Sequence, residues 1–311
     1  MPASPEIFPG ITHLSGRFRG ILLDAYGVFW GSNEFGLLPG AKEAMEKLVS
    51  SGKIVGILSN STQLALKEIH KLNRHGLERG KHFHFLQTSG EVARSIFLNE
   101  KLPFETPKNR FFLFGGAHPR FSSHEAIFQD TRYMETSDID EADFIYIAVP
   151  HINGEDQENP EVFQEEVARI KLRNLPMVCP NPDQFAHEGN PPKAVVRQGS
   201  IARMYEKIGG QVFYIGKPYA RAYEMAMDDF KHEGVTHSSD VLMVGDTPET
   251  DIRGARSLGI ASALITQTGI MADRIHCAGL ESVLRDLSPC DCPDYFIGRF
   301  IDDIHAASQP C

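Results

Sequence analysis

The fold is decided by the stretch Ile21-Leu22-Leu23-Asp24-Ala25-Tyr26-Gly27, in which a short apolar run ends on a carboxylate. An uninterrupted apolar run bounded by turn residues is typical of a strand that is buried on both faces of a parallel sheet. A second run, residues 53–58, ends on Ser59 and Asn60. Residues 40–49 place apolar side chains at helical spacing between the two runs, with Gly52 where a C-terminal cap falls. This order predicts a right-handed strand–helix–strand unit.

The same pattern returns late in the chain. Residues 212–216 lead into Lys217, and residues 241–245 lead into Asp246, while residues 261–265 form one more apolar run. We therefore expect strands at all three places in the same core sheet. Open α/β sheets bind ligands beyond the carboxyl ends of their strands. The polar residues that follow these runs are predicted to meet there.

The middle of the chain has an α/β pattern of its own. Its strands are predicted at residues 111–114, 144–149 and 177–179, with helical segments between them. An inserted domain explains this better than one continuous sheet. The predicted fold is α/β: a Rossmann-like, doubly wound parallel sheet core, residues 1–90 and 197–311, with a smaller inserted α/β cap domain, residues 91–196.

Composition excludes several classes of protein. The 311 residues carry a net charge of −10, which disfavours nucleic acid as a partner. There is no apolar stretch of about 18 residues and no signal sequence at the start, so we expect a cytoplasmic protein that does not insert into membranes. The cysteines are odd in number and lack a Cys-x-x-Cys pair; Cys277, Cys290 and Cys292 are predicted to be free thiols.

Asp24 is the candidate nucleophile. A lone aspartate after a strand is usually a turn former or helix cap. A carboxylate that attacks a phosphate, however, needs a cation, hydroxyl or amide donors, and an ammonium group to neutralise the charge. Asp246, Ser59 and Lys217 offer these groups.

At these residues the sequence resembles the haloacid dehalogenase-like superfamily, in its p-nitrophenyl phosphatase-like branch with a large inserted α/β cap. The resemblance spans nearly the whole chain. Its four motifs match Leu23–Trp30, Leu58–Ser61, Gly216–Pro218 and Gly245–Asp251 in order, and Pro39–Ala41 and Asn181–Asp183 also match that branch.

The resemblance implies a role for each matched residue in phosphate chemistry. Asp24 would form an aspartyl-phosphate, Ser59 and the amide of Asn60 would hold the phosphoryl group, and Lys217 would neutralise both. The substrate would be a small phosphorylated metabolite. The branch also often forms homodimers through its caps.

The resemblance likewise implies a magnesium site. Asp24, the backbone carbonyl of Tyr26 and Asp246 would bind Mg2+, and Asp251 would orient that shell or the lysine. Helix N-capping is the alternative role for Asp251.

Two further residues, Asn181 and Asp183, either face the substrate from the cap or form a turn. Arg197 is predicted to make a surface salt bridge, and contact with an anionic substrate tail is the alternative.

Tyr26 is the departure from the family pattern. Phosphatases of this superfamily carry an acid/base aspartate two residues after the nucleophile. A tyrosine is a poor base at neutral pH, and loss of a positioned acid/base costs about 10²–10⁴-fold in rate. Two alternatives follow. One is hydrolysis of 2-haloacids on the same Asp24, since Asp-Ala-Tyr-Gly also resembles the first motif of those magnesium-independent dehalogenases; the other is a regulator that binds phosphate or nucleotide with little catalysis.

Overall fold

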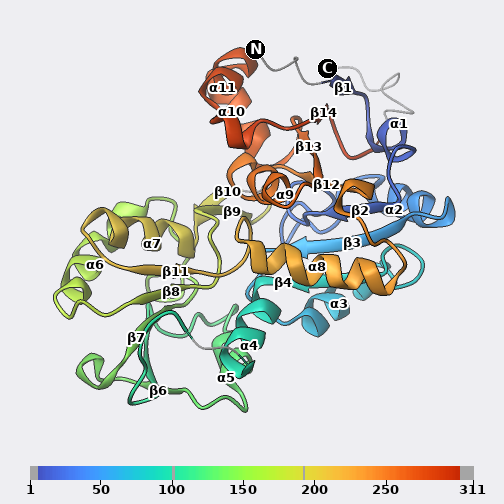
Figure 1. Ribbon diagram of the computed structural model, residues 1–311. Coiled ribbons are helices and arrows are strands. Elements are labelled where there is room, and N and C mark those ends of the chain that lie inside the picture. The colour runs from blue at the N-terminus through green and yellow to red at the C-terminus, as the bar shows by residue number, and fades with distance from the viewer. Residues whose placement is uncertain (1–5, 100–101, 192, 302–311) are drawn as a thin grey trace. The chain divides into compact units, whose positions relative to one another are not determined.

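The computed structural model describes residues 6–99, 102–191 and 193–301, and over these residues the chain forms two parallel sheets and one hairpin (Figure 1). No helix in these ranges is both long and apolar enough to cross a membrane. The predicted α/β class, with a parallel core sheet and a second sheet inserted as a cap, is confirmed.

The core sheet has, among the described residues, seven strands in the order β1-β14-β13-β12-β2-β3-β4. Their bounds are β1 (Glu6–Phe8), β2 (Gly20–Leu23), β3 (Ile54–Ser59), β4 (Phe85–Thr88), β12 (Val241–Gly245), β13 (Ala261–Ile265) and β14 (Tyr295–Ile297). Neighbours from β1 through β3 run parallel. Leu23 of the central strand β2 pairs with Val244 on one side and with Ile57 on the other. Asp24 and Asp246 therefore both leave the sheet at its carboxyl edge.

Helix α2 (Ala41–Ser50) joins β2 to β3, as the sequence predicts. Ala41, Met45 and Leu48 lie on its buried face, because residues three or four apart share one side of a helix. The remaining helices of this part of the fold are α1 (Ile11–Ser15), α8 (Ala220–His232), α9 (Arg253–Ser257), α10 (Gly269–Ala278), α11 (Leu280–Asp286) and a π-helix, Pro248–Ile252, that runs into α9.

The inserted sheet has the described order β11-β8-β7-β5-β6 and is parallel throughout. Its strands are β5 (Arg110–Phe114), β6 (Met134–Thr136), β7 (Phe144–Ile147), β8 (Met177–Cys179) and β11 (Val212–Tyr214), and an antiparallel hairpin of β9 (Phe185–Glu188) and β10 (Lys193–Val196) follows β8. The associated helices are α4 (Ser89–Asn99), α5 (His124–Phe128), α6 (Gln164–Lys171) and α7 (Gln198–Lys207), whereas α3 (Ala65–Arg74) joins β3 to β4 of the core sheet.

The prediction that residues 212–216 form a strand of the core sheet is wrong. Strand β11 pairs with β8 at the edge of the inserted sheet, with Val212 opposite Met177. All three of its residues are only partly buried, as expected at an edge and not in the centre of a core sheet. Apolar periodicity predicts that a strand exists, but it does not say which strand lies beside it.

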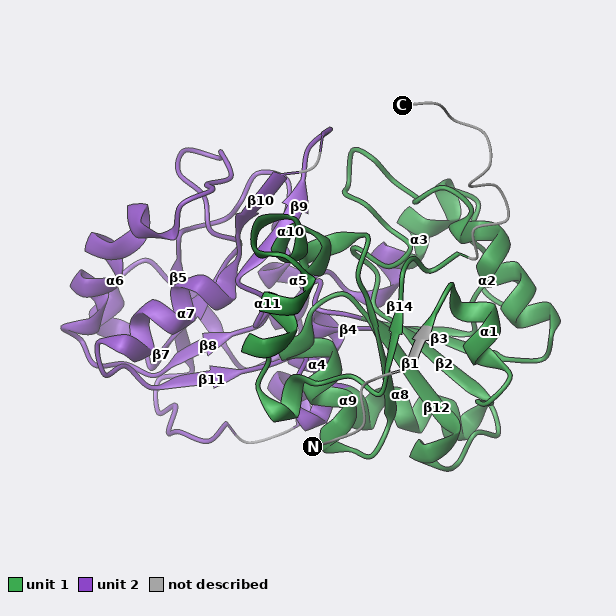
Figure 2. Ribbon diagram, turned by 90° about the horizontal axis from the view of Figure 1, so that it is seen from above, with its two compact units in different colours: residues 1–58, 69–86, 223–311 green, residues 59–68, 87–222 purple. Residues whose placement is uncertain are grey.

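The chain divides into two compact units, coloured separately in Figure 2. The first comprises residues 1–58, 69–86 and 223–311, and the second comprises residues 59–68 and 87–222. These limits divide strands β3 and β4 of the core sheet, so they do not mark the ends of an insertion. The predicted domain boundaries, 1–90 and 197–311 for the core and 91–196 for the cap, stay a prediction.

The packing of β3 yields a test of the core. A Cβ atom added at Gly56 would lie 2.2 Å from the ring of Phe85, which packs edge-on against Phe230. We expect Gly56→Ala to lower the free energy of unfolding by about 1–3 kcal/mol, the usual cost of overpacking a dense core. The measurement is urea denaturation followed by circular dichroism. Gly16→Ala is the matched control, because nothing lies within 4 Å of its added Cβ; equal stability of the two variants would contradict the packing.

Candidate active site

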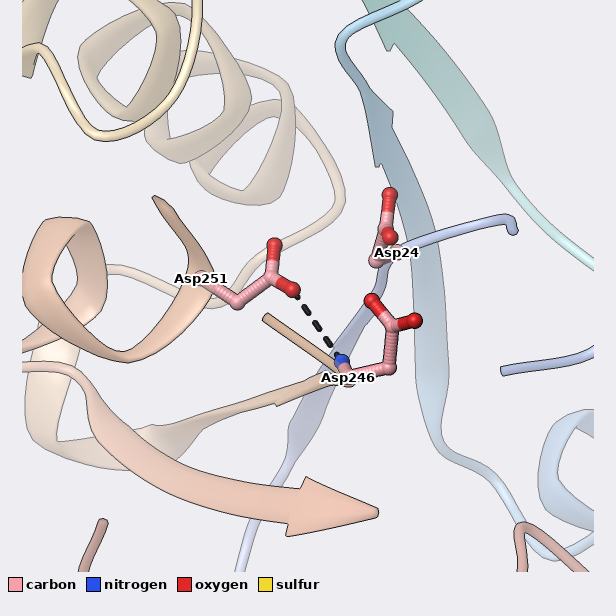
Figure 3. Close-up of side chains that lie close together, drawn as sticks. All are labelled: Asp24, Asp246 and Asp251. Atoms are coloured by element: carbon pink, nitrogen blue, oxygen red, sulfur yellow. Dashed lines mark hydrogen bonds between the residues drawn. The ribbon is translucent and has the colours of Figure 1, made fainter. Parts of the chain in front are cut away.

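Three buried carboxylates meet in the first unit. Asp24 follows β2, Asp246 follows β12, and Asp251 lies in the π-helix that comes next. Figure 3 shows their side chains close together, and one oxygen of each lies within 4.8 Å of the others. The structure thus brings together the three acidic residues that the sequence predicted for a metal site.

Asp251 is fully buried and is fixed by its own backbone neighbours. Its Oδ2 accepts hydrogen bonds from the backbone amides of Asp246 (3.1 Å) and Thr247 (3.0 Å). The hydroxyl of Tyr223 donates to the carbonyl oxygens of Thr250 and Asp251, at 3.0 and 2.9 Å. The side chain is therefore oriented before any ion binds.

Asp246 lies in a space that two glycines leave open. A Cβ atom at Gly27 would approach its Oδ2 to 2.2 Å, and one at Gly269 to 1.9 Å, and both residues have positive φ angles, 77° and 71°. Oδ2 accepts a hydrogen bond from the amide of Ile270 in the first turn of α10 (2.7 Å), and Oδ1 accepts one from the hydroxyl of Thr247 (2.9 Å). The positive end of the α10 dipole thus faces this carboxylate.

The charge in this cluster has a direct consequence. Ionised carboxylates at such distances repel one another. A divalent cation offsets this repulsion, and carboxylate oxygens are the ligands that magnesium prefers. The chemistry of the donor set therefore fits a metal ion.

The Tyr26 side chain is engaged by two residues that sequence reasoning missed. Its hydroxyl donates to Asn33 Oδ1 (3.0 Å) and accepts from Lys71 Nζ (3.4 Å). The Lys71 ammonium also lies 5.4 Å from the centre of the Tyr26 ring and 5.1 Å from that of the Trp30 ring. Lys71 is 45 positions from Tyr26, and no motif signals such a contact.

A second group of predicted residues meets around Asn60 in the second unit. Asn60 Oδ1 accepts from the amide of Lys217 (2.7 Å), and its Nδ2 donates to the Lys217 carbonyl (3.2 Å) and to Asp183 Oδ1 (2.9 Å). Gly216 has a φ of 107°, and a Cβ there would lie 2.6 Å from Asn60 Oδ1. The second and third motifs are thus joined through one buried amide.

Ser59 is buried at the end of β3, and its Oγ accepts from the amide of Ser61 (3.1 Å). The hydroxyl of Ser89, in the first turn of α4, lies 2.9 Å from the carbonyl oxygens of both Asn60 and Ser61. Lys217 is only 2% exposed. The loop that follows β3 is therefore fixed by hydrogen bonds with Ser59 at its start and with Ser89 of α4.

Asn181 and Asp183 form a turn after β8. Asn181 Oδ1 accepts from the amide of Asp183 (2.9 Å), the hydrogen bond of an Asx turn. The turn presents Asp183 to Asn60. Contact of either residue with substrate stays a prediction.

Arg197 and three of the cysteines lie outside these two groups. Arg197 is buried and forms ion pairs with Asp156 (2.9 Å) and Glu188 (2.8 Å), so the expected surface salt bridge is wrong: its partners, like the arginine, are largely covered. Free thiols are confirmed at three predicted positions: Cys277, Cys290 and Cys292.

Comparison with known proteins agrees with the motifs. The family model described as haloacid dehalogenase-like hydrolase matches residues 21–127, and the HAD-hydrolase-like model matches residues 214–286. Chronophin of Rattus norvegicus is 25% identical over 281 residues, which cover 88% of this chain and 84% of that protein.

Solved structures share the fold. A haloacid dehalogenase-like hydrolase from Brucella suis 1330 has a TM-score of 0.75 at 22% identity and covers 96% of this chain and 100% of its own. A p-nitrophenyl phosphatase from Archaeoglobus fulgidus has a TM-score of 0.63 at 21% identity, covering 92% and 97%. The chain belongs to the haloacid dehalogenase-like hydrolases.

Proposed function

We propose that this phosphatase is a magnesium-dependent phosphomonoester hydrolase that acts on a small phosphorylated metabolite with Asp24 as its nucleophile. The observation that carries the proposal is the buried cluster of Asp24, Asp246 and Asp251, in which one carboxylate oxygen of each residue lies within 4.8 Å of the other two. The cytoplasm as its compartment and a homodimer formed through the inserted domain are part of the same proposal; the dimer rests on the family resemblance alone.

The reaction has two displacements at phosphorus. In the first, a carboxylate oxygen of Asp24 attacks the phosphoryl group, the bond to the ester oxygen breaks, and the leaving alkoxide takes up a proton. In the second, water attacks the aspartyl-phosphate, releases inorganic phosphate and restores the carboxylate. Splitting one displacement into two is what a covalent nucleophile contributes.

The charge of the phosphoryl group is balanced by donors from the chain. In the proposal, Ser59 and the Asn60 amide bind phosphoryl oxygens, and Lys217 neutralises the phosphate and the nucleophile. The burial of Lys217 supports this role, because a buried ammonium group needs anionic or polar partners. The hydrogen bonds of Asn60 with the Lys217 backbone would keep both residues in register.

Magnesium would be held by Asp24, the Tyr26 carbonyl and Asp246, with Asp251 orienting this shell. When bound, the ion would neutralise the charge on the nucleophile and the phosphoryl group. Because 2-haloacid dehalogenases need no metal, the three clustered carboxylates favour the phosphatase over that alternative.

Proton transfer is the weak step of the proposed reaction. Tyr26 stands where the family has its acid/base aspartate, and its hydroxyl is hydrogen-bonded to Asn33 and Lys71. A phenol can donate a proton but is a poor base at neutral pH. We expect slow hydrolysis of the aspartyl-phosphate for this reason.

The nucleophile is tested first. We expect Asp24→Asn to abolish the magnesium-dependent release of phosphate from a panel of phosphate esters, p-nitrophenyl phosphate included, because an amide does not replace the attacking carboxylate. Asp228→Asn, at an exposed position of α8, is the control and should retain full activity. Undiminished phosphate release by the Asp24 variant would refute the proposed nucleophile.

Magnesium binding is tested independently of turnover. A saturating ligand at 100 times its Kd stabilises a folded protein by about 2.7 kcal/mol. We expect Asp246→Asn to lose this magnesium-induced rise in Tm in differential scanning calorimetry. Without metal, the variant should be at least as stable as the parent, because one of three repelling charges is gone. An unchanged magnesium response would exclude Asp246 as a ligand.

Tyr26 is tested by restoring a carboxylate. Tyr26→Asp should raise the steady-state rate by about 10²–10⁴-fold, the usual contribution of a positioned acid/base, whereas Tyr26→Phe supplies none and should not raise it. The measurement is phosphate release under saturating ester and magnesium. Tight phosphate-ester binding by both variants without any gain in rate would instead favour the regulator alternative.

A further inference from the structure

The loop between β5 and α5, residues 115–123, contains a histidine, His118, whose side chain is buried in the second unit. Its Nδ1 accepts hydrogen bonds from the backbone amides of Arg120 (3.1 Å) and Phe121 (3.2 Å). The imidazole also stacks on the ring of Phe121, with 4.8 Å between the ring centres. One side chain therefore holds the turn that follows it.

These two hydrogen bonds determine the protonation state of His118. A neutral imidazole carries one proton, and a ring nitrogen that accepts a hydrogen bond cannot carry it. The proton is therefore on Nε2, and a second proton could only go to Nδ1. There it would face the two amide N–H groups. Protonation of His118 and the two hydrogen bonds that hold the loop thus exclude each other.

A second histidine has the same arrangement in the loop after β7. The ring centre of His151 lies 5.0 Å from that of His118, and its Nδ1 accepts from the amide of Gly154 (3.0 Å). In both rings Nε2 is buried and has no hydrogen-bond partner among the described residues. An imidazolium at His118 would therefore lie against a ring that offers it no acceptor.

The charges beside His118 are already balanced. Asp156 Oδ1 lies 4.0 Å from His118 Nε2, too far for a hydrogen bond. The Asp156 carboxylate pairs with the guanidinium groups of Arg197 (2.9 Å) and Arg120 (3.1 Å). Arg197 pairs in addition with Glu188 (2.8 Å). Two carboxylates thus face two guanidinium groups, and a positive charge on His118 would have no counter-ion of its own.

The charged and titratable groups near His118 come from four segments: Arg120 and His124 around its own loop, Tyr146 on β7, His151 and Asp156 after β7, and Arg197 before α7. Burial lowers the pKa of His118 to about 4; the charge of Asp156 acts in the opposite direction, and His151, Arg120 and Arg197 lower the pKa further. The ring is therefore neutral at pH 7, in agreement with its hydrogen bonds.

We propose that His118 is a pH switch of the second unit: its neutral ring keeps the β5–α5 loop closed, and acid opens this loop. An imidazole released into water has an ordinary pKa near 6.5. Between pH 6.5 and about 4 the open loop binds a proton that the closed loop does not bind. Opening therefore becomes about tenfold more frequent for each pH unit that the pH falls in this window. Above the window neither form is protonated at His118, and below it both are.

The loop that His118 holds also contacts the segment after β3. It ends at Ser123, whose hydroxyl donates to Thr62 Oγ1 (2.9 Å). Opening that extends to Ser123 would remove this contact from the segment that carries Ser59 and Asn60. An effect of acid on phosphate binding rests on the proposed function, whereas the opening of the loop does not.

Hydrogen–deuterium exchange of the full-length protein tests the switch. The opening constant of the Arg120 and Phe121 amides is measured from pH 6.5 to pH 4.5, after correction for the intrinsic pH dependence of exchange. We expect this constant to rise on the order of thirtyfold over the range.

The variant His118→Asn isolates the titration of the ring. Its side-chain oxygen can accept in place of Nδ1 but does not titrate, so the opening constant should change by less than about threefold. His237→Asn, at an exposed position of the first unit, is the matched control and should keep the parental pH dependence. The same pH dependence in the parent and in His118→Asn would overturn the switch.

Nuclear magnetic resonance of the parent protein with 15N-labelled histidine is a second test, which needs no variant to fold. His118 is identified by its nuclear Overhauser contacts with the stacked ring of Phe121. We expect a protonated Nε2 and an unprotonated Nδ1 at neutral pH, and no titration of this ring above about pH 5. A proton on Nδ1 at neutral pH, or titration near pH 6.5, would overturn the switch.

Discussion

The crowding of three carboxylates at one end of a parallel sheet is the constraint on which the first unit depends. Register alone places Asp24 and Asp246 side by side, because Leu23 pairs with Val244. Ionised carboxylates this close together repel each other. Backbone amides oppose this repulsion: Asp251 accepts from residues 246 and 247, and Asp246 accepts from Ile270.

In the second unit, a single side chain holds two segments of the chain together. Lys217 and the loop after β3 are far apart in the sequence, and one side-chain amide, that of Asn60, connects them. Its donor and acceptor satisfy both backbone groups of Lys217 and still reach Asp183. An aspartate at position 60 would lose the donor and so two of these contacts, which explains why an amide suits this position.

Sequence reasoning predicted the parts of this structure that are encoded locally. Strands β2, β3, β12 and β13 consist mainly of apolar residues, so their positions could be predicted closely. The site residues Asp24, Asn60 and Asp246 directly follow three of them. The strand beside β11 could not be predicted. Its pairing with β8 depends on contacts between distant segments, and a run of three apolar residues carries no information about them. The Lys71 and Asn33 contacts of Tyr26, and the charged groups around His118, arise from tertiary packing between segments that share no motif.

The two glycines beside Asp246 have a consequence for how this site can change in evolution. Gly27 and Gly269 take no part in any reaction, yet each combines a positive φ with a Cβ position already filled by the carboxylate. Any side chain there would have to strain the backbone and displace the acid at once. At this site, therefore, a residue need not take part in the chemistry to be intolerant of substitution. Gly27 and Gly269 carry no functional group, yet they are as restricted as the aspartate that they accommodate.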